Sequence, residues 1–387
     1  MEQGFYPKRC TSISLAETIV SIEQVLTEIL VRVPAKPLVR FKCVSKHWLS
    51  LISDPKFGHR HTLQNPNPPV SAVFCEKSNR RFCFIPIDLD HMRGAPSTSI
   101  NTSNHGILNP SPTGSPPFNP LKFAQNQYHA DIKVIQSCNG LFLCRLLYSP
   151  NDPPYFIFNP TTNQFSTLIP PATGERVQPC VISIALAFDP SKSPHYKVVC
   201  LRTIDGSKDG TIYHIVIYSS ETQSWRILDS SFKRVDEEQD GFVRLPPHLY
   251  DRVTESTKYR YFLESGDGHQ LHLIDIFEHS VAKFEVLEMG KDYSGWFVKY
   301  LVDLDPIYRR LNPTERYVVL FIDQEKNEEE ESSSLLLHTP GKLISYNLKC
   351  GTYKSFELTP KAGVKDHLLR VEPSNFRYME SLASVTV

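Results

Sequence analysis

The sequence predicts a small all-α module followed by a large all-β domain. Residues 21–57 space their apolar side chains three or four positions apart, as amphipathic helices do. From about residue 68 onward the apolar residues alternate in short runs instead, which is typical of strands. Four hairpin-like units with a shared spacing recur in this second region. A repeated β unit favours a β-propeller, and about 40–50 residues per blade would give six or seven blades.

The helical module opens with an apolar stripe made of Ile22, Val25, Leu26, Ile29, Leu30 and Val33. Ser21 followed by Gln24 matches a capping box, so we expect the first helix to begin at Ser21. Pro34 and Pro37 are expected to end this helix, because proline lacks an N–H and restricts the residue before it.

A second apolar cluster completes the module, and Asp54-Pro55 is expected to end its last helix. The cluster contains Leu38, Val39, Phe41, Val44, Trp48, Leu49, Leu51 and Ile52. Three such short helices cannot hide this much apolar surface from water, so part of it should bind another protein. Cys43 is expected to pack inside the module. His59 and His61 are expected to lie on a linker surface, because two histidines alone rarely bind a metal.

The order of residues in this module is distinctive: Glu28-Ile29-Leu30, Arg32-Val33-Pro34, Lys36-Pro37-Leu38, Arg40-Phe41-Lys42-Cys43-Val44-Ser45-Lys46, Trp48, Leu51-Ile52 and Asp54-Pro55. It resembles the F-box, the helical module that docks on the Skp-family adaptor of cullin-RING ubiquitin ligases. That family usually opens with Leu-Pro, which normally touches the adaptor, whereas this chain has Ser21-Ile22.

The resemblance implies that the apolar stripe and its extension contact the adaptor, with Val25, Leu26, Ile29, Leu30, Val33, Pro34, Leu38, Val44 and Trp48 as the candidate residues. The alternative is an ordinary helical subdomain whose stripe packs internally, with Trp48 as a core residue only.

Composition excludes several classes of partner. Hydrophobic residues make up 40% of the 387 and charged residues 22%, as in a globular protein. Lys+Arg and Asp+Glu are 42 each, so no overall field favours nucleic acid or an anionic membrane. Neither a run of about 18 apolar residues nor a signal-peptide core is present, so we expect no membrane association. Nine cysteines without a C-x-x-C pair suit the reducing cytosol or nucleus, and we expect no metal and no cofactor.

The repeat in the β region is defined by pairs of aromatic residues. Two aromatics lie seven residues apart on either side of a polar turn, and the first members are 60, 59 and 69 residues apart. The pairs are Phe158 and Phe165, Tyr218 and Trp225, Phe277 and Phe284, and Tyr346 and Tyr353.

Strands upstream of these hairpins support four strands per blade. Asn139-Gly140 is a preferred two-residue hairpin turn, and residues 184–201 predict two strands around a loop containing Asp189-Pro190. One such unit would contain Val134–Gln136, Leu141–Arg145, Tyr155–Asn159 and Phe165–Ile169. A β-sandwich with coincidental spacing is the alternative.

The β region also resembles the F-box-associated domain of plant F-box proteins. The resemblance is carried by 137–141, 155–162, 186–190, 193–199, 217–222 with Trp225-Arg226, and 292–300. It implies a propeller-like domain that holds the target. We therefore expect a flexible N-terminus over 1–19, an F-box over 20–63 and the β domain over 64–387, with a mobile loop over 94–120. Pairing of Val70–Cys75 with the chain near Phe376–Val385 is expected to close the domain.

No sequence motif for phosphate binding or catalysis is present, so we expect no enzymatic activity. The acidic run 324–334 predicts a solvated hairpin tip, or less simply a docking loop for a basic partner. Target contacts are expected on Pro246–Arg252 and Asp292–Trp296, with Tyr250, Tyr293 and Trp296 as candidates.

The predicted function is a substrate-recognition subunit, whose adaptor links it to cullin and RING subunits in the cytoplasm or nucleus. One alternative is a propeller that binds a small molecule or glycan, or is an enzyme, with the F-box only as an anchor. Another keeps adaptor docking but uses it outside ubiquitination.

Overall fold

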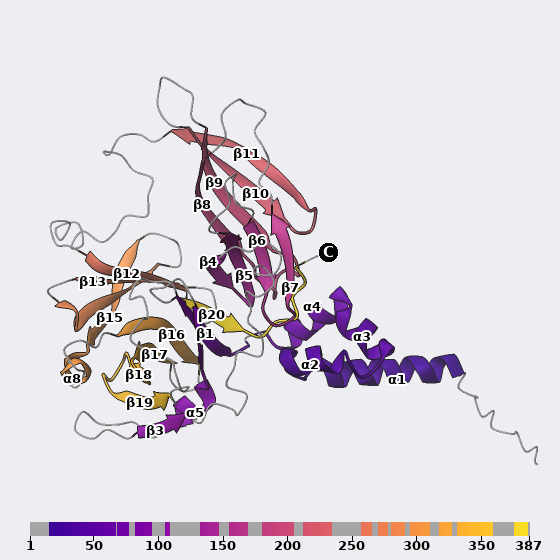
Figure 1. Ribbon diagram of the computed structural model, residues 1–387, viewed down its shortest axis with the longest axis horizontal. Coiled ribbons are helices and arrows are strands. Elements are labelled where there is room, and N and C mark those ends of the chain that lie inside the picture. Colours follow the sequence, from indigo (N-terminus) through magenta and orange to yellow (C-terminus); the bar gives the residue numbers. More distant parts are fainter. Residues whose placement is uncertain are drawn as a thin grey trace, which may run out of the picture.

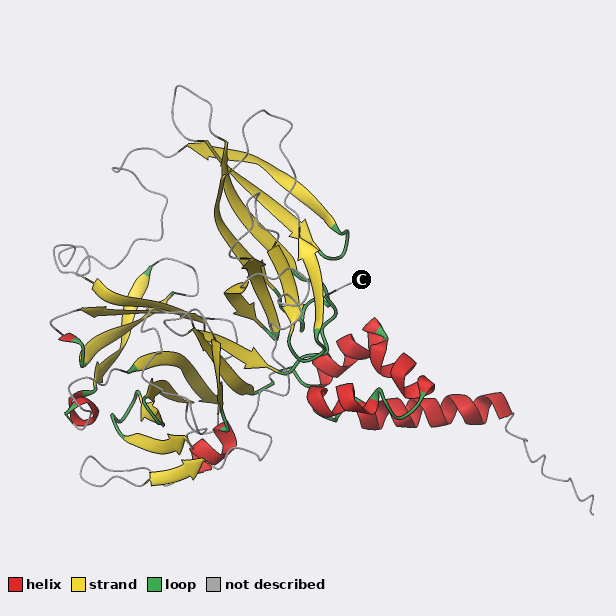
Figure 2. Cartoon of the chain, viewed as in Figure 1, coloured by secondary structure: helices red, strands yellow, loops and turns green. Residues whose placement is uncertain are grey.

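The computed structural model describes residues 15–66, 68–76, 82–94, 105–108, 132–146, 155–168, 180–204, 212–233, 257–264, 270–277, 280–290, 295–309, 317–326, 331–358 and 375–385. Helices α1–α4 gather at one end of the molecule and the strands form the rest (Figures 1 and 2). The predicted order, a helical module followed by an all-β domain, is therefore confirmed.

Four helices make up the module, one more than expected: α1 (Leu15–Leu30), α2 (Ala35–Phe41), α3 (Lys46–Ser53) and α4 (Pro55–Gln64). The prediction that the first helix begins at Ser21 is wrong, because α1 already begins at Leu15. No proline or glycine lies between Leu15 and Leu30, and Ile22 stands where the F-box family has proline. Nothing in the sequence therefore stops the helix from continuing toward the N-terminus.

Prolines and capping residues set the later helix boundaries. Pro34 precedes α2, and Pro37 lies in its first turn, where a missing N–H costs no intrahelical bond. Ser45 caps α3 by accepting a hydrogen bond from the Trp48 amide, 3.2 Å away. Asp54 accepts from the Lys56 amide at 2.8 Å, and Pro55 follows at the first helical position. Asp54-Pro55 therefore begins a fourth helix.

The β domain consists of five sheets, which are its five blades, so the expectation of six or seven is wrong. Blade 1 has the order β2 (Phe82–Pro86), β1 (Val70–Glu76), β20 (Asn375–Met379). Blade 2 contains β4 (Ile132–Cys138), β5 (Leu141–Leu146), β6 (Tyr155–Asn159) and β7 (Gln164–Leu168). Blade 3 contains β8 (Cys180–Ala187), β9 (Lys197–Ile204), β10 (Ile212–Ser219) and β11 (Ser224–Lys233).

Blade 4 contains β12 (Thr257–Glu264), β13 (Leu271–Phe277), β14 (Lys283–Met289) and β15 (Trp296–Asp303). Blade 5 contains β16 (Val318–Lys326), β17 (Glu331–Thr339), β18 (Lys342–Asn347) and β19 (Tyr353–Leu358), extended by β3 (His105–Leu108). In the described part of the β domain, two short helices accompany the blades, α5 (Leu89–Gly94) and α8 (Asp305–Tyr308). Phe158 and Tyr218 end the third strands of blades 2 and 3, 60 residues apart, and this spacing exceeds the 40–50 residues assumed for the count.

Three of the four aromatic pairs lie directly opposite each other in their hairpins: Phe158 with Phe165, Tyr218 with Trp225, and Tyr346 with Tyr353. In each hairpin the residue two positions before the second aromatic has a left-handed backbone: Asn163 (φ 58°), Gln223 (φ 50°) and Gly351 (φ 69°). The fourth pair does not follow this rule. Phe277 and Phe284 belong to different hydrophobic clusters, although β13 and β14 form the predicted hairpin. Phe277 ends the second strand of its blade, whereas the first aromatics of the other three pairs end the third strand.

Hydrophobic clusters join neighbouring blades. Phe74, Phe142 and Tyr378 pack where blades 1 and 2 meet. Leu143 of blade 2 shares a cluster with Val198 of blade 3. On the other side, Val73 of blade 1 packs with Leu336 of blade 5. Ile274 of blade 4 packs with Leu337 of blade 5.

The predicted closing pair is confirmed, because β1 and β20 form an antiparallel ladder in which Phe74 lies opposite Phe376. The structure also confirms the four strands predicted between Val134 and Ile169, which are β4 to β7. It confirms the two strands on either side of Asp189-Pro190, which are β8 and β9. The acidic run lies in the β16–β17 hairpin, with Lys326 opposite Glu331. The expected mobile loop contains a strand, since β3 pairs in parallel with β19. Much of that loop lies outside the described residues.

Candidate protein-binding surfaces

The helical module has its own small core. Leu30, Leu38, Ile52 and Phe57 are all at most 3% exposed and share one cluster. Phe41 and Trp48 pack against this cluster edge to face, with ring centroids 5.7 Å apart. Leu30 and Leu38 were predicted to contact an adaptor, but they fill this core and do not face solvent.

Other apolar side chains of the module face solvent. Val25 and Ile29 are 59% and 57% exposed, and they lie one turn apart on the same face of α1. Val44 and Leu49 are also exposed, at 61% and 47%. We call these four residues the exposed apolar set of the F-box. Leu49 was absent from the predicted contacts, although its place beside Trp48 in the apolar cluster was visible in the sequence.

The remaining predicted contact residues lie at the edge of the module core. Leu26, Val33 and Trp48 are half-buried against it, whereas Pro34 is exposed. These residues could extend the exposed set without unpacking the core.

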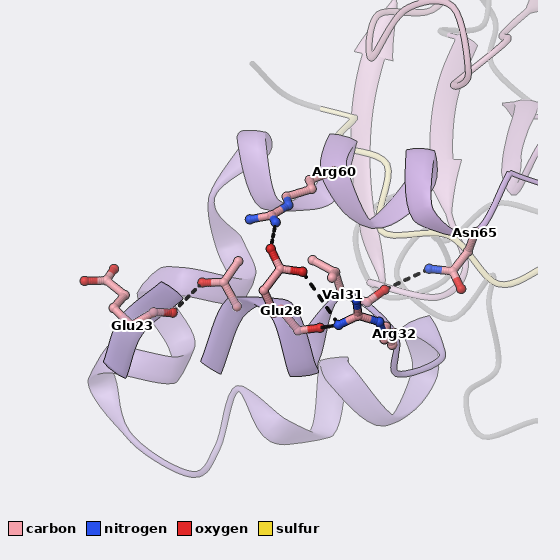
Figure 3. A network of polar contacts seen from close by, with 7 residues as sticks. Glu23, Glu28, Val31, Arg32, Arg60 and Asn65 are labelled. Carbon is pink, nitrogen blue, oxygen red and sulfur yellow. Dashed lines mark hydrogen bonds and ion pairs between the residues drawn. The ribbon is translucent and has the colours of Figure 1, made fainter. Parts of the chain in front are cut away.

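Polar contacts fix α1 against α4 (Figure 3). The Glu28 carboxylate on α1 forms ion pairs with Arg32 and with Arg60 of α4. Asn65, just after α4, donates from Nδ2 to the Val31 carbonyl at 2.9 Å. The end of α1 that carries Ile29 is therefore held in place before any partner binds.

Two predictions about single residues of the module are wrong. His61 is 5% exposed and its Nε2 lies 2.8 Å from the Val33 carbonyl oxygen, so it belongs to the packed module and not to a linker surface. Burial lowers the pKa of His61, and the hydrogen bond to Val33 opposes that shift only in part. Cys43 is exposed, because it lies in the turn between α2 and α3.

A second exposed apolar surface lies on blade 4. Phe262, Leu273, Leu287 and Val298 are cross-strand neighbours in a row over all four strands of the sheet. The ends of this row are open, with Phe262 61% and Val298 38% exposed, and Leu301 on β15 is 73% exposed.

Trp296 borders this surface, which we call the blade 4 face. It packs against the cluster of Leu273, Phe277 and Leu287 and contacts Phe262 edge to face, with centroids 5.8 Å apart. Trp296 therefore lies at the border of an apolar surface, and its role as a target contact stays a prediction. Tyr250, Tyr293 and the loop 246–252 lie outside the described residues.

One cavity of about 100 Å³ lies between α5 and blade 5, lined in part by Met92, Arg93, Asp323 and Lys354. Its charged groups already have protein partners. Arg93 forms a bidentate pair with Asp323 at 3.0–3.2 Å, and Lys354 donates to the carbonyls of Met92 and Arg93. This polar cluster holds α5 onto the sheet.

Within the described part of the chain, no group of three or more His, Cys, Asp or Glu side chains is arranged to hold a metal ion. Among the described helices, none has the length and apolar character needed to cross a membrane.

Comparison with known proteins gives two family matches. Residues 23–60 match the F-box domain, and residues 97–288 match the F-box associated beta propeller domain. An F-box protein of Arabidopsis thaliana is 30% identical over 427 aligned residues, which cover 97% of this chain and 94% of that protein. F-box only protein 8 of Arabidopsis thaliana is 27% identical over 70% of this chain and 80% of its own length.

Among solved structures, a mutant of Aleuria aurantia lectin in complex with α-methyl-L-fucoside matches 59% of this chain and 60% of its own, at 10% identity. Its TM-score of 0.25 is too low to support any conclusion. The near-complete overlap with the 30% identical relative, together with both domain matches, shows that this chain belongs to the F-box proteins that carry an F-box associated β-propeller domain.

Proposed function

We propose that this protein is the substrate-recognition subunit of a Skp–cullin–F-box ubiquitin ligase. The F-box would dock on a Skp-family adaptor, which links it to cullin and RING subunits, and the propeller would hold a target protein. The observation that carries the proposal is the exposed apolar set Val25, Ile29, Val44 and Leu49, because it stays exposed although the module core is already filled. Large apolar side chains in solvent on so small a module are typical of a protein-binding surface.

The adaptor interface can be tested without disturbing the module core. We expect Ile29→Asp to abolish recovery of a Skp-type adaptor and cullin, because it places a charge on an exposed residue of the proposed interface. The variant should keep the wild-type unfolding transition. Leu30→Asp is the informative contrast, since Leu30 is 2% exposed and an unpaired charge there should unfold the module.

Co-purification with recombinant adaptor, next to thermal unfolding of each variant, measures both effects. Full adaptor recovery by Ile29→Asp, and by Val25→Asp, would rule out this surface. Full recovery by a variant lacking residues 1–60 would rule out the ligase function altogether.

Target binding is proposed for the blade 4 face. Three of the large apolar side chains exposed on the described blades lie on this face: Phe262 on β12, and Val298 and Leu301 on β15. Leu301→Asp should leave folding unchanged, because the side chain is 73% exposed. In a pulldown from cell lysate, this variant should no longer recover the proteins that bind the wild-type propeller. Ile227→Asp, on the exposed part of β11 in blade 3, is the matched control. An unchanged recovery profile for Leu301→Asp would place target binding elsewhere.

A further inference from the structure

A short segment after the last strand joins the F-box to the blades. Residues 380–385 leave β20 without regular secondary structure and pass close to α2 and α4 (Figure 1). Leu382 is 8% exposed and belongs to the same hydrophobic cluster as Leu30, Leu38 and Phe57 of the F-box. The F-box core is therefore completed by a residue that lies more than 300 positions away in the sequence.

The segment also makes backbone contacts with the F-box. Oε2 of Glu380 accepts a hydrogen bond from the amide of Lys36, 3.1 Å away in the first turn of α2. Pro34 gives that helix no side-chain cap, so Glu380 supplies a carboxylate where free N–H groups and the helix dipole favour one. At Gly58 of α4 a Cβ atom would lie 3.2 Å from the Leu382 carbonyl oxygen, which shows how closely the two backbones approach.

The same residues are anchored on the propeller. Asn159 at the end of β6 is fully buried and donates from Nδ2 to the carbonyls of Ser381 and Ala383, at 3.0 and 2.8 Å. The hydroxyl of Tyr196 donates to the Val385 carbonyl at 3.1 Å. Ala383 and Val385 also pack in the cluster between blades 2 and 3. Every second residue of the segment thus binds the blades, while Glu380 and Leu382 bind the F-box.

We propose that residues 380–385 lock the F-box at a fixed position on the propeller, with Glu380 and Leu382 as positioning residues. The functional consequence of this lock rests on the proposed function. In a ubiquitin ligase, the lock would set where a bound target lies relative to the ubiquitin-charged enzyme. Acceptor lysines on one side of the complex would then be modified and others would not.

Spin labels test the lock independently of ubiquitin. Cys43 on the F-box and Cys350 on blade 5 are exposed, whereas Cys75, Cys138, Cys144 and Cys200 are buried. The remaining three cysteines, Cys10, Cys83 and Cys180, are replaced by serine. Pulsed dipolar spectroscopy of the full chain then measures the distance between spin labels on Cys43 and Cys350. The lock predicts one narrow distance distribution for the otherwise unchanged protein.

The double variant Glu380→Ala/Leu382→Ala should lose that narrow distribution and give a broad one. Glu380→Gln/Leu382→Met keeps an acceptor oxygen and an apolar side chain and should restore it. Leu63→Ala, at a leucine of α4 that is 51% exposed, should leave it unchanged. If the double alanine variant unfolds the F-box, Glu380→Ala alone replaces it, because Leu382 then stays in the core. A narrow, unshifted distribution in the folded double alanine variant, or in the Glu380→Ala variant where that one replaces it, would overturn the proposal.

Ubiquitin transfer tests the consequence without a known target. The full chain is assembled with a Skp-type adaptor, cullin, RING protein and ubiquitin-charged conjugating enzyme, and the lysines modified on the chain itself are mapped by mass spectrometry. The wild type should modify a restricted set, and the double alanine variant should spread modification to further lysines. The rate at the original set should fall about tenfold, since misplacement far from the reacting atoms reduces rates strongly.

An unchanged lysine pattern in a variant with a broadened distance distribution would overturn the positioning role. If the wild type itself fails to capture the adaptor, the proposed function fails, while the distance measurement still decides whether the lock exists.

Discussion

Among the described glycines, Gly140 has the least room for a side chain. It follows Asn139 in the β4–β5 turn, and both have positive φ (44° and 86°), as the Asn-Gly pair predicted. A Cβ atom on Gly140 would lie 2.4 Å from the Cβ of Ser381 and 3.0 Å from the Met379 carbonyl oxygen. The turn therefore holds the backbone that leads from β20 into the locking segment.

We expect Gly140→Ala to destabilise the protein by about 2–3 kcal/mol, from left-handed backbone strain and the displacement of Ser381. Gly341→Ala is the matched control, because Gly341 has φ 74° but nothing within 4 Å of the added Cβ. It should cost only about 1 kcal/mol. Chemical denaturation measures both, and equal losses would show that the contact with Ser381 is not the cause.

His61 gives the F-box a predictable pH dependence. Burial lowers its pKa in the folded state below the unfolded value of 6.5, so the unfolded chain binds the proton more readily. The contribution of neutral His61 to the free energy of unfolding is therefore fully present above about pH 6.5 and decreases as the pH falls below that value. His61→Gln should flatten this loss between pH 7.5 and pH 5.5 in thermal unfolding of the F-box. An undiminished loss in the variant would assign the acid sensitivity to other groups.

At the scale of single elements, hairpins were predictable where local backbone rules decide them. The seven-residue aromatic spacing identified the paired positions of three hairpins, because each turn has a left-handed residue at the same place. In the fourth, Ala282 stands there, and alanine does not favour that conformation. The turn changes, the two aromatics face different clusters, and the spacing alone did not reveal it.

The exposed apolar surface of the F-box was only partly predictable. Helical periodicity identifies an apolar stripe, but it does not say which part of a wide stripe faces the core. Ile29 and Leu30 are adjacent and equally apolar, yet one is 57% exposed and the other 2%. The difference comes from α2, α4 and Leu382, which lie outside α1 and pack against Leu30.

The early start of α1 leads to a prediction at the same scale. Changing Ser21-Ile22 to Leu-Pro should make α1 begin near residue 22 instead of at Leu15, because an interior proline costs about 3 kcal/mol of helix stability. Amides of residues 19–21, which have carbonyl partners within α1, should then lose protection in hydrogen exchange, while those of 26–30 keep it. Adaptor capture should be unchanged or stronger, since this is the opening usual in the family. Retained protection of 19–21 would show that contacts outside α1 hold the extension.

For the whole molecule, the sequence identified the closing strands but not the number of blades. The strand patterns of β1 and β20 and the need to cover an open sheet edge predicted their pairing. The blade count failed because it relied on an average blade length, whereas loops make these blades longer. The lock between F-box and propeller was not predictable, since nothing local to residues 380–385 indicates which core Leu382 enters.

The first and last strands of the propeller, β1 and β20, pair with each other, so a substitution of Tyr378 on β20 tests the whole propeller. Tyr378 is 2% exposed, packs 6.0 Å from the Phe74 ring of β1, and its hydroxyl lies 3.2 Å from Thr161 Oγ1 in blade 2. Tyr378→Ala should therefore cost about 3–5 kcal/mol, as expected for a buried aromatic that leaves a cavity. Tyr378→Phe should cost only about 1 kcal/mol, because it removes the hydrogen bond and keeps the ring.

Tyr308→Ala, at a tyrosine that is 38% exposed, is the control and should change stability by about 0.5 kcal/mol or less. Equilibrium unfolding followed by tryptophan fluorescence and by circular dichroism measures all three variants. Both probes should shift together in Tyr378→Ala, because β20 ties the blade formed by the N-terminal strands to blade 2. Separate transitions for the two probes, or a loss no larger than that of Tyr308→Ala, would mean that the propeller does not depend on this closure.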